Sequence, residues 1–252
     1  MNICLFEPSE LKLPLELADK RAAHILKVLH KGEGDSFCAG VIGGQAGRAL
    51  ITRIERDEGS PHKGSLFFEF TPEHEGRGLF PLKMIVGFPR PVQLRRILRE
   101  LSSLGVAAIH LAATDLGEKS YLSSSLATKE AARSYLIEGA TQAGSTHISE
   151  LSFHPSLDSC LEVVQAGKGG GCALLALDNA KPTQSLARAL KVPPSEAVAA
   201  IGSERGWSER ERCLLCDRGF GLVGLGERVL RTETACTAAA SLILSAMGCF
   251  DR

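Results

Sequence analysis

The first third of the chain alternates short apolar runs with turn residues, a pattern typical of a small β-rich unit. From Leu15 to Leu29, apolar positions recur at spacings of three and four, which predicts one helix that ends before Gly32 and Gly34. The glycine-containing segment 43–47 is predicted to be a hairpin loop, and the polar stretch Thr71–Gly78 is the best candidate for a linker. We expect strands at Ser36–Ile42, Arg48–Glu55 and Leu66–Phe70.

After this stretch, the pattern changes to apolar runs of strand length that alternate with segments of helical periodicity. Such alternation predicts a mostly parallel sheet covered by helices, and hence an α/β fold. The expected strands are Lys83–Phe88, Val106–Ala112, His147–Phe153, Cys172–Asp178, Ala197–Ile201 and Gly221–Val223. The expected helices are Val92–Leu104, Leu126–Ala143, Leu157–Ala166, Gln184–Leu190, Ser208–Arg218 and Thr232–Met247.

Composition narrows the class of protein. With 44% hydrophobic and 23% charged residues, the chain of 252 residues falls in the range of globular proteins. Its N-terminus lacks the basic and apolar runs of a signal peptide, and no apolar stretch is long enough to cross a bilayer. We therefore expect a cytoplasmic protein without a membrane partner, whose eight cysteines are reduced thiols.

Positive charge is concentrated in one segment, although the formal net charge is zero. Residues 77–100 carry six basic residues and one acidic residue, whereas residues 1–76 carry 9 basic and 12 acidic residues. On the helix expected here, Arg95, Arg96 and Arg99 would share a face that could contact phosphates, together with the preceding Arg90. A solvated helix face is an equally good interpretation.

Two loops that follow predicted strands are candidates for a ligand site, because ligands of open α/β sheets bind beyond the carboxyl ends of the strands. The first, Ile201–Trp207 (IGSERGW), leads into a helix that Ser208 can cap, with Glu211 as its capping-box partner. The second, Leu225–Ala235 (LGERVLRTETA), enters a helix rich in small residues. Taken singly, the first loop could be an ordinary turn. The second could be the charged entry of a buried helix.

No metal site is predicted from the sequence. Cys213 and Cys216 have the spacing of metal ligands, but a second pair is missing and a core position is favoured. His24 and His30 are six residues apart on the expected helix, and therefore lie on different faces.

The two C-terminal loops together resemble a known family. The pairing of IGSERGWSERE with LGERVLRTETA resembles the IGPEGG-like loop and the LG-x-RILR-x-ETA segment of the RsmE family, in the SPOUT superfamily. The stretch from His24 to Asp35 (HILKVLHKGEGD) is similar to the family's N-terminal H-x-x-x-VLR…GD segment, and Pro89–Arg90 and Leu104–Val106 match two further elements. The likeness spans nearly the whole chain.

The resemblance implies two domains: a PUA-like β-barrel for RNA at residues 1–76, and a SPOUT methyltransferase domain with a deep trefoil knot at residues 77–252. It implies methylation of uridine N3 in 16S ribosomal RNA, with S-adenosyl-L-methionine as the methyl donor. The partners that it implies are 16S rRNA or the small ribosomal subunit, and a second copy of the chain in a homodimer.

The resemblance also implies roles for single residues. Arg231 matches the last arginine of the RILR segment and would stabilise charge on the uracil carbonyl oxygens, although an ion pair with Glu233 or Glu227 is the alternative. RNA binding is expected of His24 and Arg90, which lie in segments that match the family, and of Arg95 and Arg99 on the basic helix. Cofactor binding falls to Leu177, Ile201, Gly202, Ser203, Glu204, Gly206, Leu225, Gly226, Val229 and Leu230.

Several positions depart from the family pattern. They are Ser203 and Arg205 in the first loop, Ser145 in place of an arginine, Glu100 and Ser103 in the predicted basic helix, and His30. These departures leave two other hypotheses open: a catalytically degenerate relative that binds RNA during ribosome assembly, and a SPOUT methyltransferase with another RNA target.

Overall fold

The computed structural model describes residues 2–57, 63–118, 120–121, 128–164 and 171–251. The chain divides into two compact units, of which the first comprises Met1–Gly78 and Ala140–Ile148 and the second Leu79–Gly139 and Ser149–Arg252. The division after Gly78 lies two residues from the expected domain boundary. The short segment 140–148 joins the first unit, which the linear pattern of the sequence did not indicate.

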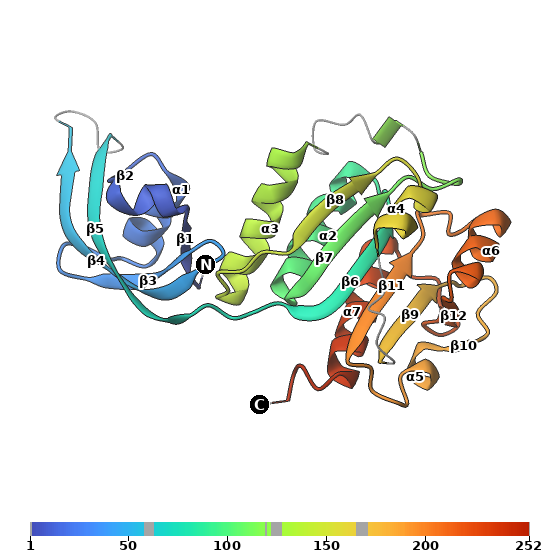
Figure 1. The fold of residues 1–252 in the computed structure, drawn as a ribbon. Coiled ribbons are helices and arrows are strands. Elements are labelled where there is room, and N and C mark those ends of the chain that lie inside the picture. Colours follow the sequence, from blue (N-terminus) through green and yellow to red (C-terminus); the bar gives the residue numbers. More distant parts are fainter. Residues whose placement is uncertain (1, 58–62, 119, 122–127, 165–170, 252) are drawn as a thin grey trace. The chain divides into compact units, whose positions relative to one another are not determined.

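The first unit is built on a five-stranded sheet with the order β1-β3-β4-β5-β2 (Figure 1). All neighbours pair antiparallel except β1 and β3, which are parallel. Its apolar core includes Phe6, Ile25, Phe37 and Ile51. The elements are β1 (Cys4–Phe6), a 3-10 turn (Pro8–Lys12), β2 (Leu15–Glu16), α1 (Lys20–Ala23), a π-helical turn (His24–Val28), β3 (Ser36–Val41), β4 (Gln45–Arg56) and β5 (Gly64–Glu75).

The helix predicted over Leu15–Leu29 is shorter than expected. Leu15 pairs with Leu66 of β5 as a strand residue, and the helix begins only at Lys20. Asp19 fixes that start, because its side chain accepts a hydrogen bond from the Arg21 amide at 2.7 Å. Leu15 is thus buried by strand pairing, and its helical spacing from the later apolar residues misled the prediction.

The linker predicted at Thr71–Gly78 is wrong for most of its length. Strand β5 continues to Glu75 and pairs with β4 down to Gln45, so the expected hairpin loop 43–47 is also shorter. Pro72 is tolerated within the strand because the register shifts opposite it, between Ala46 and Gly47. A proline without an amide proton fits such a bulge.

The second unit contains a seven-stranded parallel sheet with the order β10-β12-β9-β11-β6-β7-β8 (Figure 1). The mostly parallel α/β sheet predicted from the sequence is confirmed. Its strands are β6 (Phe80–Gly87), β7 (Val106–Ala112), β8 (Glu150–His154), β9 (Cys172–Leu177), β10 (Gln184–Ser185), β11 (Glu196–Ile201) and β12 (Gly221–Gly224). Its helices are α2 (Pro91–Ser103), α3 (Lys129–Ala143, whose last turn belongs to the first unit), α4 (Leu157–Val163), α5 (Leu186–Ala189), α6 (Glu209–Asp217) and α7 (Thr232–Ala246). Parts of the helices predicted at Leu126–Ala143 and Leu157–Ala166 lie outside the described residues.

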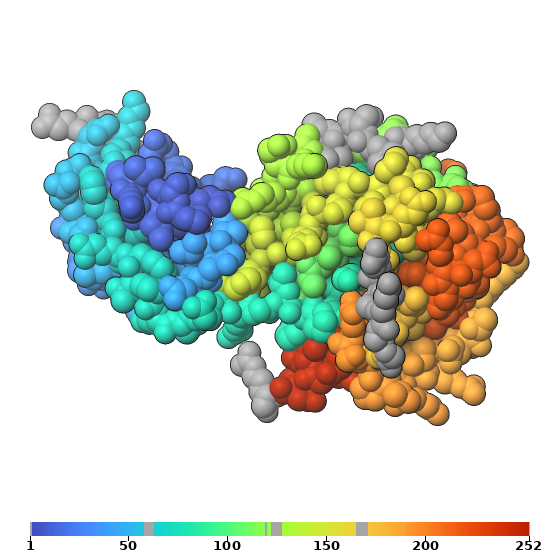
Figure 2. All heavy atoms as spheres, in the orientation of Figure 1, coloured from blue at the N-terminus to red at the C-terminus, as the bar shows by residue number. Residues whose placement is uncertain are grey.

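Helices cover the sheet according to the alternation of side chains along its strands. Helices α2 and α7 pack together and against β6, β7 and β11, whereas α4 and α6 contribute to a separate apolar cluster. That cluster joins Leu161 of α4 and Leu215 of α6 to Ile85, Val198 and other strand residues. In the space-filling view, the yellow atoms of β8 and α4 lie at the surface of this unit (Figure 2).

None of the helices in the described part of the chain combines the length and the apolar character that a membrane-spanning segment requires.

Candidate functional site

A cavity of about 430 Å³ lies in the second unit, beyond the carboxyl ends of β9, β11 and β12. Loops following four neighbouring parallel strands of the sheet, β12, β9, β11 and β6, contribute to its wall. All ten residues that the resemblance assigns to cofactor binding line this cavity, as does Arg231. Arg90, which was predicted from the sequence to bind RNA, also lines the cavity. The fold therefore gathers residues from positions 90 to 235 around one space.

Glycines make the first loop compact. A Cβ atom on Gly202 would lie 2.7–2.9 Å from backbone atoms of Gly206, and one on Gly87 would collide with the Ser203 amide nitrogen. Gly206 itself has a φ of 73°, in the left-handed region that favours glycine. Its amide donates to the Ser203 carbonyl at 2.8 Å and closes the turn. The loop thus needs glycine for its shape.

The end of this loop is fixed to the sheet and to the following helix. The indole Nε1 of the buried Trp207 donates to the Leu177 carbonyl at 3.0 Å, which ties the loop to the end of β9. The predicted capping box of α6 is confirmed: the Glu211 amide donates to Ser208 Oγ, and the Ser208 amide donates to Glu211 Oε2. The other oxygen of Glu211 accepts a hydrogen bond from the Asp115 amide at 2.9 Å. These bonds hold the helix start beside the cavity.

Asp178 organises the loop after β9. Its Oδ1 accepts hydrogen bonds from the amides of Ala180 and Lys181, and its Oδ2 accepts one from Arg212 Nε. Burial favours a raised pKa, but these donors outweigh it and hold the pKa of Asp178 below its usual value. Asp178 lines the cavity, so a residue of α6 that was not predicted, Arg212, helps to shape the wall.

We expect Arg212→Leu to destabilise the protein by about 3 kcal/mol at neutral pH, because it leaves the buried Asp178 carboxylate without its charged partner. A carboxyl group with a depressed folded-state pKa stabilises the fold above its unfolded pKa, and loses that contribution as the pH falls through the folded value. The difference in unfolding free energy between wild type and variant should therefore shrink toward pH 4 and below.

Arg210→Leu is the matched control, since Arg210 lies on the same helix but pairs with Asp115 and Asp158 in solvent. Exposed pairs contribute about 1 kcal/mol or less. Denaturant unfolding monitored by circular dichroism at several pH values measures both variants. Equal losses for Arg210→Leu and Arg212→Leu, or a loss for Arg212→Leu that does not depend on pH, would contradict the assignment.

Arginine side chains are the positive groups of the cavity wall. Arg228 and Arg231 are exposed, and no ion pair of either is found among the described residues. Glu233, the partner that the alternative hypothesis gave to Arg231, instead lies 3.9 Å from Arg96. The Glu204 carboxylate accepts a hydrogen bond from the Arg90 amide at 2.8 Å. The guanidinium of Arg231 is therefore available to a ligand.

Two polar atoms in the cavity wall lack partners. Gln93 Oε1 and Ser203 Oγ are buried, and neither has a hydrogen-bond partner within the described part of the chain. Unpaired buried polar atoms are costly, so such atoms facing a cavity point to a polar ligand. The sequence gave no signal for Gln93, because it lies within the first turns of α2 rather than in a loop. Arg205, a departure from the family pattern, is exposed and is not among the residues that line the cavity.

The basic face predicted on α2 is not a single patch of free charge. Arg95 pairs with Glu138 of α3 at 3.0 Å, whereas Arg96 approaches Glu233 of α7. Arg99 pairs with Glu100, its neighbour in the chain. The arginines thus diverge toward different acidic partners, because successive positions on a helix point about 100° apart. His24 belongs to the first unit, where its Nε2 is buried without a partner among the described residues.

Comparison with known proteins defines the class. A family model described as RNA methyltransferase domain matches residues 78–244, which include the whole parallel sheet. Ribosomal RNA small subunit methyltransferase E of Treponema pallidum is 41% identical over 249 residues, which cover 97% of this chain and 91% of the relative. Ribosomal RNA small subunit methyltransferase E 1 of Borreliella burgdorferi is 30% identical, with 96% and 97% covered.

The fold agrees with these relatives. The crystal structure of ribosomal RNA small subunit methyltransferase E from Neisseria gonorrhoeae, bound to S-adenosyl methionine, matches with a TM-score of 0.73 at 20% identity, over 97% of both chains. The cavity and sheet therefore lie in an RNA methyltransferase domain. Within that class, the chain belongs to the ribosomal RNA small subunit methyltransferase E family.

Proposed function

We propose that this protein transfers a methyl group from S-adenosyl-L-methionine to N3 of a uridine in 16S ribosomal RNA. The observation that carries the proposal is that all ten expected cofactor residues and Arg231 line one cavity in the domain that the family model matches. Relatives at 41% and 30% identity are named as methyltransferases of small-subunit ribosomal RNA, which supports the substrate.

The cavity fits the proposed cofactor in size and chemistry. About 430 Å³ lies within the range of sites for small ligands. Leu177, Ile201 and Leu225 provide apolar walls. Ser203 Oγ and Gln93 Oε1, which have no partner among the described residues, can form hydrogen bonds with polar groups of a ligand. The compact turn at Gly202 lets the backbone approach a ligand closely.

In such a reaction, the protein must hold the reacting groups in line and stabilise the charge that develops. When bound, S-adenosyl-L-methionine supplies the methyl group from its sulfonium. As N3 attacks and its proton leaves, negative charge develops on the flanking carbonyl oxygens of the uracil. We assign the stabilisation of that charge to Arg231, whose guanidinium lines the cavity and has no ion pair among the described residues. The extended backbone of Arg231 at the start of α7 places the side chain outside the helix.

The finer features of the fold are part of the same proposal. We propose that the first unit is a PUA-like RNA-binding domain, supported by its strongly curled, mostly antiparallel five-stranded sheet around its own core. For the second unit we propose the deep trefoil knot of the SPOUT superfamily. We also propose that the protein assembles as a homodimer, and analytical ultracentrifugation can test this oligomeric state. We also propose that the protein acts in the cytoplasm, where its eight cysteines would remain reduced.

Binding of RNA by Arg90, Arg95 and Arg99 can be tested through salt dependence. Removal of one arginine that binds a phosphate should reduce the slope of log affinity against log salt concentration by about one, without changing sequence preference. We expect this for Arg99→Ala, measured by fluorescence anisotropy with a fragment of 16S rRNA. Lys191→Ala, which removes an exposed charge after α5, is the control. Equal slopes for wild type and Arg99→Ala would remove Arg99 from the RNA surface.

Calorimetric titration with S-adenosyl-L-methionine and S-adenosylhomocysteine tests the proposed cofactor. We expect one site per chain with a dissociation constant in the micromolar range. The hypothesis of a degenerate RNA-binding relative predicts no binding of either compound. Another RNA target would leave the titration unchanged and would be recognised from the position of the methylated nucleotide.

A further inference from the structure

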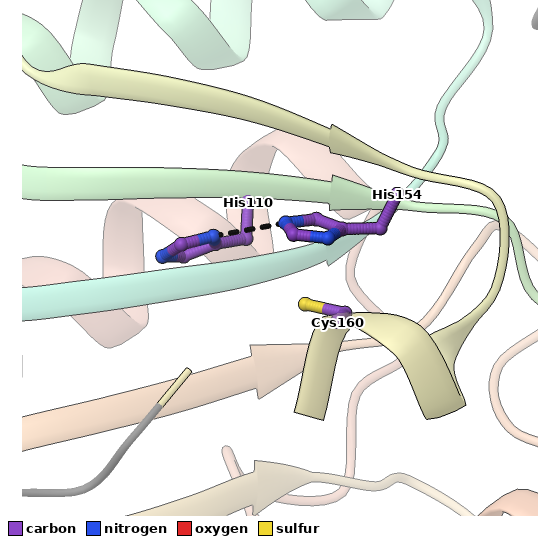
Figure 3. A group of neighbouring side chains, drawn as sticks. All are labelled: His110, His154 and Cys160. Atoms are coloured by element: carbon purple, nitrogen blue, oxygen red, sulfur yellow. Dashed lines mark hydrogen bonds between the residues drawn. The ribbon is translucent and has the colours of Figure 1, made fainter. Parts of the chain in front are cut away.

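A group of potential metal ligands lies outside the cavity, on the face of the sheet covered by α4. His110 of β7, His154 at the end of β8 and Cys160 of α4 direct their side chains toward one another (Figure 3). Their nitrogen and sulfur ligand atoms all lie within 4.8 Å of one another. The three residues belong to the second unit, and all are at least nine-tenths buried.

The two imidazole rings are already close enough for joint coordination. His110 Nδ1 and His154 Nε2 are 3.1 Å apart and share a hydrogen bond. Two ligand atoms of a tetrahedral zinc ion are separated by about 3.3–3.6 Å, given metal–ligand distances of about 2.0–2.3 Å. The two nitrogens are about 0.2–0.5 Å closer than this and must move slightly apart, and the sulfur must move by about 1.5 Å at most. Cys160 is in the first turns of a short helix, so a small side-chain rotation can supply that movement.

The protonation states of the two histidines suit a metal ion. Burial, reinforced by the neighbouring His154 and Lys83, lowers the pKa of His110 to about 4, and burial also lowers the pKa of His154. Both rings are therefore neutral at physiological pH, which is the state that coordinates metals. Burial raises the pKa of the Cys160 thiol to about 12, so this thiol is protonated in the metal-free protein and must lose its proton to coordinate an ion.

We propose that His110, His154 and Cys160 form a buried site for a single thiophilic metal ion with a filled d shell, Zn²⁺ or Cu⁺. Thiolate and imidazole are the ligands that such ions prefer. Cu⁺ would form a neutral three-coordinate complex, whereas Zn²⁺ would need a fourth ligand such as water. The ion would tie β8, an edge strand of the sheet, to β7 and α4. This inference does not depend on the proposed methyl transfer.

The number of protons released when the ion binds is a measurable property of the proposed site. In the metal-free state, one ring donates a hydrogen bond to the other, and the thiol carries its own proton. On binding, the donating ring remains neutral by holding its proton on its other nitrogen, while the thiol releases one proton to solvent. Binding should therefore release about one proton per ion, and the affinity should rise about tenfold per pH unit.

The test is a titration of the reduced, chelator-treated full-length protein with Zn²⁺ and, without oxygen, with Cu⁺, each against a competing chromophoric chelator. Cys213 and Cys216 are exposed, so both are replaced by serine in all samples to remove surface binding. We expect one equivalent of at least one ion to bind, and Cys160→Ala to weaken that binding at least 100-fold. Cys236→Ala removes another fully buried thiol, which belongs to no such group of potential ligands among the described residues, and it should leave binding unchanged.

Two further readouts identify the ligands independently of stability. Co²⁺ should give a thiolate-to-cobalt charge-transfer band in the parent protein, which carries only the two serine replacements, and in Cys236→Ala, but not in Cys160→Ala. Calorimetry in buffers of different ionisation enthalpy should measure the number of protons released. Circular dichroism checks that Cys160→Ala, a small change within an apolar cluster, remains folded. The proposal is overturned if neither ion binds with one-to-one stoichiometry, or if parent and Cys160→Ala bind alike.

Discussion

Arg231→Ala should lower the turnover number for methyl transfer by about 10²–10³-fold, while the dissociation constant for S-adenosyl-L-methionine changes by less than about threefold. Loss of a preorganised charge that acts on the developing oxyanion raises the barrier of the chemical step but leaves the ground-state complex largely intact. The prediction follows from the position of Arg231 in the cavity wall without an ion pair among the described residues. Single-turnover kinetics with saturating cofactor and RNA measure the chemical step directly.

Arg228→Ala is the comparison, because it removes the same charge from the same cavity. We expect it to reduce turnover by about tenfold or less, since the resemblance gives the catalytic role to Arg231 alone. Arg231→Lys should recover part of the turnover, as it restores the charge without the planar guanidinium. Equal losses of turnover and cofactor affinity in Arg231→Ala would assign this residue to cofactor binding. Equal effects of both alanine variants would indicate a general effect of charge.

Gly202→Ala should weaken the binding of S-adenosyl-L-methionine at least 100-fold, equivalent to about 2.8 kcal/mol. The new methyl group would lie 2.7–2.9 Å from the backbone of Gly206, whereas ordinary contact begins near 3.4 Å. Both sides of this contact are backbone, so the turn from Ser203 to Gly206 must open by about half an ångström or more. Isothermal titration calorimetry with the cofactor measures the loss.

Gly221→Ala separates this effect from a general cost of replacing a glycine in the same unit. Its Cβ would meet a carbonyl oxygen at 3.9 Å, an ordinary distance, and Gly221 begins β12, whose residue Val223 lines the cavity. We expect this variant to bind the cofactor as the wild type does. Thermal unfolding of both variants shows whether the fold is retained. Wild-type cofactor affinity in a folded Gly202→Ala protein would mean that the first loop does not contact the cofactor.

Much of the second unit could be predicted from the sequence because its elements are long and bounded by glycine or polar residues. The expected strand Val106–Ala112 has the observed bounds, and the capping box of Ser208 and Glu211 is present as predicted. Parallel strands buried on both faces give continuous apolar runs, which stand out in a sequence. The two candidate loops, which line the cavity, followed from the rule that ligand sites lie beyond the carboxyl ends of the strands.

Other features depend on tertiary interactions that a linear pattern does not contain. Leu15 has helical spacing but pairs as a strand residue, and Pro72 lies within a strand because a bulge accommodates it. Arg212 shapes the cavity only because the fold brings Asp178 to it from 34 positions earlier in the chain. The predicted face of Arg95, Arg96 and Arg99 is divided among acidic partners on two other helices and on α2 itself.

Methyl transfer from S-adenosyl-L-methionine to uridine N3 of 16S rRNA is the central claim about this protein. It is tested most directly by incubating the purified protein and isotopically labelled cofactor with small ribosomal subunits from cells that lack the modification, followed by nuclease digestion and mass spectrometry of the RNA. We predict labelled 3-methyluridine at a single position in 16S rRNA, and its strong reduction with Arg231→Ala. Labelled methyl groups on another nucleotide or at another atom, or no labelled RNA with protein that binds the cofactor, would contradict the claim.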